Sequence, residues 1–125
     1  MKYKFTLEDA YVSGWKGLNF SSYSEAADFD RASAGVFTVT SHHGKVKSLI
    51  SDRIYYVLEG EGYFIINDEN IPVSQTDVVI VPRNTIYDYY NQNGPMKLFL
   101  VHTPAYSFEA EVTFDDAQSH PLEEE

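Results

Sequence analysis

The middle of the chain alternates between short apolar runs and clusters of turn-forming residues. The apolar runs are rich in Val, Ile, Phe and Tyr, residue types that suit the pleated surface of a sheet. Groups of Gly, Pro, Asn and Asp separate the runs. We expect strands at residues 34–40, 54–58, 63–66, 77–81, 86–90 and 96–102. Strands this short, spaced by about ten residues, predict a sandwich or barrel rather than βαβ units.

The segments on either side of these strands are less regular. Residues 21–31 form the only plausible helix, with Ser22 as its cap and Glu25 three residues later. Residues 15–18 fit either a strand or an extended arm, and residues 108–114 alternate like a late edge strand.

The whole chain fits one domain in three parts. We expect an N-terminal arm at 1–33, a β-barrel at 34–114 and a solvated, flexible acidic tail at 115–125.

Composition supports an all-β class and excludes two kinds of partner. The chain has 125 residues, of which 15% are aromatic, including ten Tyr and eight Phe. Its formal net charge is -10 at pH 7. Phosphate backbones and anionic lipid surfaces would be repelled, so we expect neither a nucleic-acid partner nor a membrane partner.

The expected compartment is the cytoplasm. The absence of cysteine excludes disulfides and thiolate metal sites. Residues 1–10 lack the apolar core of a signal peptide, and no apolar run is long enough to span a membrane.

Two motifs carry a family resemblance. The run 54–62 is a strand entering a turn, where Gly60 and Gly62 permit unusual backbone angles. The run 77–82 is a strand that ends at a proline, which cannot donate to the ladder. Together with residues 102–106, these motifs resemble the small single-domain cupins over roughly residues 34–106. The resemblance implies an all-β fold, the cupin double-stranded β-helix or jelly-roll barrel.

The cupin resemblance also implies where a metal would bind, and those positions have changed. Arg53 stands at the position of the family's metal-binding glutamate, and Tyr87 stands at the position of a histidine. The two remaining histidine positions fall on Lys47 and Leu49, or on Val46 and Ser48, and none of these is a suitable ligand. We therefore expect no metal and no other cofactor.

The dipeptide His42–His43 is the remaining source of a metal ligand. An extended dipeptide sends its two side chains to opposite faces, so only one of them can enter a site. The favoured interpretation is a solvated loop pair ahead of Gly44.

Arg53 at a glutamate position inverts the charge inside the barrel mouth. Its guanidinium suits a carboxylate, a phosphate or a polyhydroxylated ligand, unless Asp52 or Asp77 neutralises it. The alternative is a surface turn at 51–53 with Arg53 facing solvent.

Strand alternation gathers aromatic residues around Arg53. Tyr55 shares its face, Tyr89 lies beside Tyr87, and Phe64 faces inward, whereas Asp88 faces the other way. These side chains predict an aromatic pocket with hydroxyl groups, suited to a polar, anionic or sugar-like ligand.

His102 ends the last barrel strand and is expected to enter the same mouth. A histidine ordinarily titrates near neutral pH, and paired with a tyrosine hydroxyl it could transfer a proton next to a carbonyl group. His102 and Tyr87 are therefore the candidates for acid–base catalysis.

Two functions remain open at this point. The first is a small-molecule-binding cupin that does not turn its ligand over, with Arg53, Tyr55, Phe64, Tyr87, Tyr89 and His102 as the ligand-binding residues. The alternative is a metal-independent sugar isomerase or epimerase. In either case we expect a homodimer formed through the outward residues Tyr56, Tyr63 and Ile65.

Overall fold

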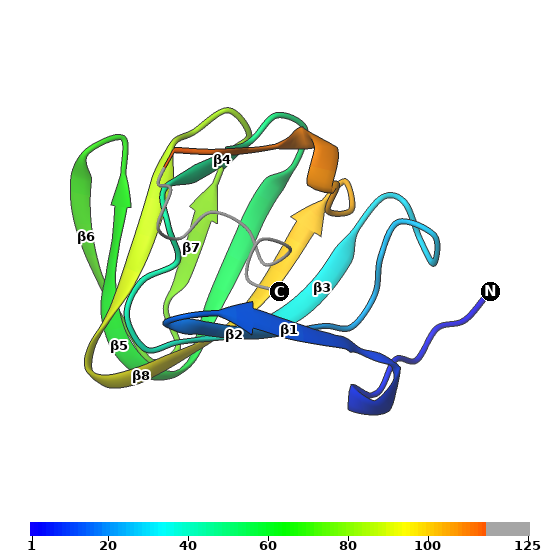
Figure 1. Cartoon of the computed structure of the whole chain (residues 1–125), viewed down its shortest axis with the longest axis horizontal. Coiled ribbons are helices and arrows are strands. Elements are labelled where there is room, and N and C mark those ends of the chain that lie inside the picture. The colour runs from blue at the N-terminus through cyan, green and yellow to red at the C-terminus, as the bar shows by residue number, and fades with distance from the viewer. Residues whose placement is uncertain (115–125) are drawn as a thin grey trace.

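The computed structural model describes residues 1–114, which form one curled antiparallel sheet (Figure 1). The strands are β1 Tyr11–Trp15, β2 Leu18–Ser22, β3 Ser33–Val39, β4 Val46–Ser48, β5 Asp52–Ile66, β6 Glu69–Ser74, β7 Val78–Val81, β8 Tyr87–Thr103 and β9 Glu111–Thr113. The only helical elements in this part of the chain are two short 3₁₀ turns, at Leu7–Asp9 and Phe108–Ala110. The structure confirms the expected all-β class. The expected acidic tail, 115–125, lies outside the described residues.

Two long strands, β5 and β8, form the backbone of the sheet. They pair from Asp52↔Thr103 to Ile66↔Tyr87, and the register shifts twice near residue 59. β8 also pairs with β3 and β4, whereas β5 also pairs with β6 and β7. The sheet order runs β1-β2-β3-β8-β4-β9. Each long strand joins two of the expected short strands.

Gly60 and Gly62 allow the two strands to stay paired through the bend. We expected a turn here, but the chain continues through both residues as β5: Gly60 lies at a register shift against β8, and Gly62 pairs with Asn91. Gly60 has φ 84, and a Cβ on Gly62 would clash with the Tyr90 carbonyl oxygen. Only glycine fits such an approach, and a bulge adds the local twist that lets a long strand curl.

Alternation along β5 places the expected residues in the core. Arg53, Tyr55 and Val57 are all buried, and Tyr56 between them is exposed. Phe64 and Tyr89 are completely buried as well. Each large apolar side chain removed from water stabilises the fold by about 1.5–3 kcal/mol, so this cluster contributes strongly to stability.

The prediction of a helix at 21–31 is wrong. Ser21 and Ser22 pair with Val36 and Gly35 in the ladder between β2 and β3, which extends the sheet through the hairpin of β1 and β2. The carboxylate of Asp28 accepts a hydrogen bond from the Glu25 backbone N–H at 3.0 Å, closing a turn instead of a helix. A helix this short has a costly nucleus and little apolar surface to bury, so the ladder is favoured.

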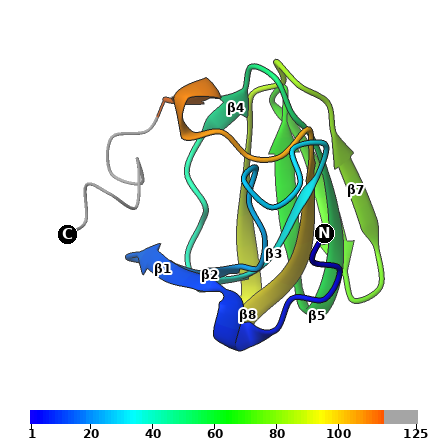
Figure 2. The same ribbon diagram turned by 90° about the vertical axis from the view of Figure 1, so that its right-hand side faces the viewer.

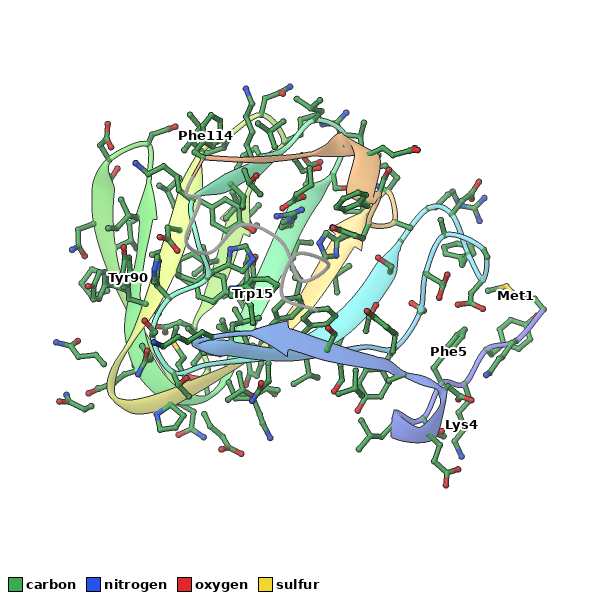
Figure 3. The ribbon with its side chains drawn as sticks, viewed as in Figure 1. Met1, Lys4, Phe5, Trp15, Tyr90 and Phe114 are labelled. Atoms are coloured by element: carbon green, nitrogen blue, oxygen red, sulfur yellow. The ribbon has the colours of Figure 1, made fainter. Side chains whose placement is uncertain are left out.

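The two ends of the curled sheet are the β1–β2 hairpin and the β4–β9 pair, and they face each other across the open side of the curl. Figure 2 shows the β1–β2 hairpin and the β4 region at opposite ends of this side. In Figure 3, Trp15 at the hairpin lies toward the centre of the molecule, whereas Tyr90 lies toward its edge. Across residues 1–114, no helix has the length and apolar character needed to cross a membrane.

One expected outward residue is buried. Asp88 faces away from the barrel interior, yet it is only 4% exposed because the segment 42–44 covers it. Of the three residues expected to mediate dimerisation, Tyr56 is exposed, whereas Tyr63 and Ile65 are less accessible. Dimerisation stays a prediction.

Candidate functional site

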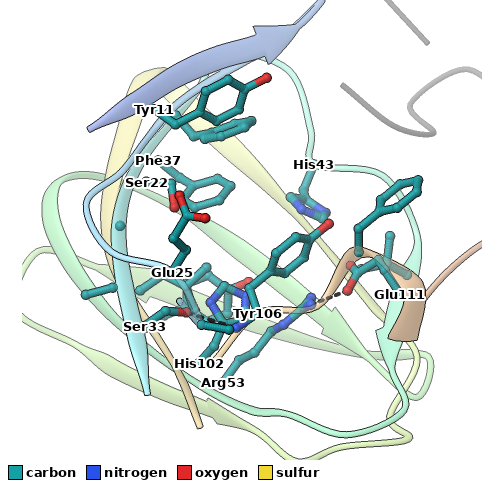
Figure 4. Close-up of a pocket in the computed structure, with 18 of the residues that line it drawn as sticks. Tyr11, Ser22, Glu25, Ser33, Phe37, His43, Arg53, His102, Tyr106 and Glu111 are labelled. Carbon is teal, nitrogen blue, oxygen red and sulfur yellow. Dashed lines mark hydrogen bonds and ion pairs between the residues drawn. The ribbon is translucent and has the colours of Figure 1, made fainter. Parts of the chain in front are cut away.

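A cavity of about 450 Å³ lies inside the curl, between the β1–β2–β3 end of the sheet and the β4–β9 end. Figure 4 shows the side chains that line it. One part of its wall is aromatic, and the floor carries charged and polar groups. The lining residues that bear on function are Tyr11, Trp15, Phe20, Glu25, Ser33, Phe37, His43, Arg53, Tyr55, His102, Tyr106 and Glu111.

The aromatic wall is built from the hairpin and β3. Phe20 stacks on Phe37 with ring centroids 5.2 Å apart, and Trp15 meets Phe20 edge-on at 6.1 Å. Tyr11 also packs against Phe20, with ring centroids 6.0 Å apart. Consecutive antiparallel strands bring these side chains together on one face, since each alternates with an outward residue. The wall offers flat apolar surface to a planar ligand.

Arg53 forms the charged floor of the cavity and is 3% exposed. Its Nη1 donates to the Tyr87 hydroxyl at 2.7 Å, and its Nη2 forms an ion pair with Glu111 (Figure 4). Burial acts to lower the pKa of Arg53, but Tyr87, Glu111 and Tyr55 outweigh it and raise the pKa well above its usual value. The alternative of a solvent-facing Arg53 is therefore wrong.

The acid that neutralises Arg53 is Glu111, not Asp52 or Asp77. The Asp52 carboxylate instead binds Arg83, at 3.3 Å from its Nη2, on the exposed side of β5. Asp77 accepts the backbone N–H of Ser74 at 2.8 Å and closes a turn. Glu111 reaches Arg53 from β9, which pairs with β4.

Three side chains form a hydrogen-bonded chain at the floor of the cavity. The Tyr87 hydroxyl accepts from Arg53 and lies 2.5 Å from the Tyr55 hydroxyl. Burial raises the pKa of both phenols, so both keep their protons at neutral pH. Tyr89 lies beside them; its hydroxyl has no partner at hydrogen-bond distance in residues 1–114, although Tyr55 is near enough to act on its pKa.

His43 is buried in the cavity wall, so its assignment to a solvated loop is wrong. It is 7% exposed and packs on Tyr89 at 5.0 Å and on Trp15 at 5.5 Å. Its Nδ1 lies 2.9 Å from the Gly44 carbonyl oxygen, which only accepts, so Nδ1 carries the proton. The neutral ring therefore keeps a free lone pair on Nε2. Burial lowers the pKa of His43, which favours this neutral form.

The partner histidine, His42, turns to the opposite face, as expected for an extended pair. Its Nδ1 lies 2.8 Å from the Asp88 carboxylate, and its ring stacks on Tyr90 at 4.8 Å. Of the two, His43 alone lines the cavity.

His102 enters the cavity from β8, as the alternation predicted. It is 7% exposed and meets the Tyr106 ring edge-on at 5.3 Å. Burial, followed by the nearby Arg53 charge, lowers the pKa of His102 well below its usual value. His102 is thus a neutral, polar part of the floor at pH 7.

The structure brings together three of the six expected ligand-binding residues at the cavity surface. Arg53, Tyr55 and His102 line it, and Tyr87 lies directly behind them in hydrogen-bond contact with the first two. Phe64 and Tyr89 are completely buried in the core and do not line it.

Sequence reasoning missed His43, Glu111 and the aromatic wall. The chain contains a single Trp at position 15, and Glu111 lies within the alternating run 108–114. The single Trp and the alternating run are the two sequence features that mark these segments, but neither specifies a distance to Arg53.

The residues at the family's metal positions do not fit a divalent cation. A guanidinium has no lone pair to donate, and here it bonds to the phenol that occupies a histidine position. Glu111 is the nearest carboxylate, and it is already paired with Arg53. Within the described part of the chain, no group of three or more His, Asp or Glu side chains is placed to hold a metal.

The fold and the cavity define a class: a small all-β barrel protein with a ligand-sized pocket inside the barrel. Comparison with known families gives the same result, because residues 51–102 match the family described as Cupin domain. The chain is therefore similar to the small cupins over this part of its length, and it has their fold.

Three individual proteins illustrate this relationship. An uncharacterised protein of Methanocaldococcus jannaschii is 34% identical over 64 residues, and the chain spans about half of that relative's length (51%). Pac13 from Streptomyces, described as a nucleoside dehydratase, is 28% identical, with a TM-score of 0.82 and 92% of each chain covered.

Variants of Pac13 with a single tyrosine or histidine replaced have been solved with uridine. KdgF from Halomonas is 13% identical with a TM-score of 0.74, covers 86% of this chain and 97% of its own, and shows the shared fold alone.

Proposed function

We propose that this cupin is a metal-independent enzyme that removes water from a nucleoside-like substrate, with His43 as the base. The observation that carries the proposal is the state of His43. Its Nδ1–H is fixed on the Gly44 carbonyl, its Nε2 lone pair is free, and its ring lines a cavity with an aromatic wall. A merely ligand-binding cupin does not require a buried, unprotonated imidazole with one nitrogen left free.

Elimination of water uses this base directly. Nε2 takes a proton from a carbon next to a carbonyl group, and the electron pair of that C–H bond forms a new C=C bond. The hydroxyl group on the neighbouring carbon leaves with the proton that His43 has taken, which completes the water molecule and returns the ring to its neutral form. The neutral form of His43 is the active form, and burial keeps the ring in that form at pH 7 by lowering its pKa.

Tyr55 supplies the proton donor on the floor of the cavity. Arg53 donates to Tyr87, and the Tyr87 hydroxyl lies 2.5 Å from Tyr55. If each group donates to the next, the Tyr55 proton points to a substrate oxygen. A phenol whose pKa burial has raised keeps its proton, so it stabilises a developing oxyanion as a hydrogen-bond donor.

The substrate class follows from the two halves of the cavity. The wall of Trp15, Phe20 and Phe37 suits a stacked base, which is worth about 1–3 kcal/mol per aromatic contact. The polar floor suits the hydroxyls of a sugar. Arg53 is already neutralised by Glu111, and Glu25 adds a further carboxylate to the lining, so an uncharged ligand fits better than an anion.

The comparisons support the same class. Pac13 shares the fold over 92% of each chain and is described as a nucleoside dehydratase. A sugar isomerase or epimerase would use the same base, but the aromatic wall favours a substrate that carries a planar base.

The experiment is a turnover assay on protein dialysed against a chelator. Nucleosides whose sugar carries an aldehyde or ketone group are incubated with wild type and with His43→Gln, and the loss of one water is followed by mass spectrometry. We expect product from wild type and a rate at least about 100-fold lower from the variant. Binding of uridine without turnover of any such nucleoside would reduce the function to ligand binding.

A further inference from the structure

A buried carboxylate lies immediately outside the cavity, on the opposite face of β8. Asp88 is 4% exposed and makes three hydrogen bonds. Its Oδ1 accepts the backbone N–H groups of Gly44 and Tyr89 at 2.8 and 2.7 Å, and its Oδ2 lies 2.8 Å from Nδ1 of His42. A buried carboxylate is costly unless it is fully bonded, so a specific role is expected of it.

The contacts of Asp88 hold the segment that carries His43. His42 and Gly44, the residues on either side of His43, both bond to this one carboxylate. The His43 backbone N–H itself donates to the Tyr89 carbonyl at 3.0 Å. The segment 42–44 is therefore fixed against β8 at three successive residues, and of these residues only His43 lines the cavity.

The same contacts control which nitrogen of His43 is free. Nδ1 is protonated because the Gly44 carbonyl accepts from it at 2.9 Å. That carbonyl belongs to the residue whose N–H is bound by Asp88. Rotation at Gly44 would move the carbonyl away from Nδ1, and the proton would then distribute between the two ring nitrogens.

We propose that Asp88 is a positioning residue for His43, acting through the Gly44 N–H and the His42 ring to keep the Nε2 lone pair free and directed into the cavity. The proposal rests on the assignment of His43 as the base. It predicts that loss of the carboxylate changes the tautomer of a ring that Asp88 does not touch. A purely structural carboxylate would change the stability of the fold but not that tautomer.

The test is nitrogen NMR of protein labelled with ¹⁵N-histidine, without any substrate. The chain has four histidines, and a His43→Gln sample assigns the His43 signals. In wild type we expect a protonated Nδ1 and an unprotonated Nε2. In Asp88→Ala the two signals are expected to move toward the average of the two tautomers. Glu69→Ala, which removes an exposed carboxylate from β6, is the matched control and leaves them unchanged.

Asp88→Asn supplies a rescue. Its side-chain oxygen still accepts from Gly44 and Tyr89, and its amide faces His42. We expect this variant to retain the wild-type signals of His43, and to retain turnover of the carbonyl-bearing nucleosides that Asp88→Ala loses by about tenfold. If Asp88→Ala does not fold, His42→Phe takes its place, because it removes one Asp88 contact and keeps a ring over Tyr90.

Unchanged His43 signals in folded Asp88→Ala, or in His42→Phe where that variant replaces it, would overturn the proposal. The NMR result is independent of turnover. Wild-type protein with the expected tautomer but no turnover would contradict the enzyme assignment and leave the positioning by Asp88 intact.

Discussion

Glu111→Gln tests the charge balance of the cavity floor. Glu111 and Arg53 form an ion pair whose side chains are only 8% and 3% exposed. The substitution keeps the size and one oxygen of the side chain, but it removes the charge that compensates Arg53. Because the guanidinium also bonds to Tyr87 inside the barrel, it cannot turn to solvent to recover hydration.

The expected loss of stability is large for a single atom replacement. A hydrogen bond to a charged group contributes about 1.5–3 kcal/mol, and breaking a buried ion pair costs about 3–5 kcal/mol. The substituted amide would retain a neutral hydrogen bond, so we expect Glu111→Gln to lose about 2 kcal/mol and Glu111→Ala about 3–5 kcal/mol. A change of about 2 kcal/mol corresponds to a Tm lower by roughly 6–8 °C in a domain of this size.

Urea unfolding followed by tyrosine and tryptophan fluorescence measures this difference through the midpoint at constant slope. Glu109→Gln is the control, since Glu109 lies two residues away and is exposed. The double variant Arg53→Met/Glu111→Gln is expected to recover part of the loss, because it leaves no unpaired buried charge. If Glu111→Gln unfolds at the same urea concentration as Glu109→Gln, the ion pair does not stabilise the floor and the reasoning fails.

Further predictions concern the backbone, the histidines and the aromatic wall. Thr76 has φ 78, an angle that is unfavourable for a β-branched residue, so Thr76→Gly is expected to stabilise the fold by about 1 kcal/mol and to raise Tm by a few degrees in a calorimetric scan. A lower Tm would show that the backbone at this position is not strained. Gly62→Ala would press its Cβ on the Tyr90 carbonyl and should cost about 2 kcal/mol or more by urea unfolding; a neutral effect would contradict the close pairing of β5 and β8. The pKa of His102 is lowered in the folded state, so below the usual histidine pKa of 6.5 the unfolded chain binds more protons than the folded one. The contribution of His102 to stability is therefore full above pH 6.5 and falls as the pH drops below it. His102→Gln should flatten this decline in a plot of Tm against pH. Trp15→Ala should weaken binding of uridine about tenfold by calorimetric titration, whereas Tyr3→Ala, an exposed aromatic, should not.

The strand pattern predicted the wall of the barrel well because its causes are local. Alternation from residue 53 correctly placed Arg53 and Tyr55 on the inner face, and the expected break between the runs 77–81 and 86–90 is a turn in which Asn84 has a left-handed φ of 61. These features depend on the two-residue period of a strand and on turn chemistry, both of which can be derived from a few neighbouring residues.

The site could be predicted only in part because its other half depends on contacts distant in sequence. Glu111 meets Arg53 across 58 positions, and Asp88 binds Gly44 across 44. The solvated-loop interpretation of His42–His43 was wrong because nothing near those residues shows that Asp88 is buried beneath them. The helix at 21–31 failed for a related reason, since Ser21 and Ser22 pair in the β2–β3 ladder with residues further along the chain.

Proton transfer from carbon to His43 without a metal can be measured directly. Chelator-treated protein is incubated in D₂O with a nucleoside that carries a carbonyl group on its sugar, and incorporation of deuterium next to that carbonyl is followed by proton NMR. We predict exchange or elimination with wild type, no dependence on added metal, and a rate about 100-fold lower for His43→Gln. Equal rates for His43→Gln and wild type, or activity that appears only when a metal is added back, would contradict it.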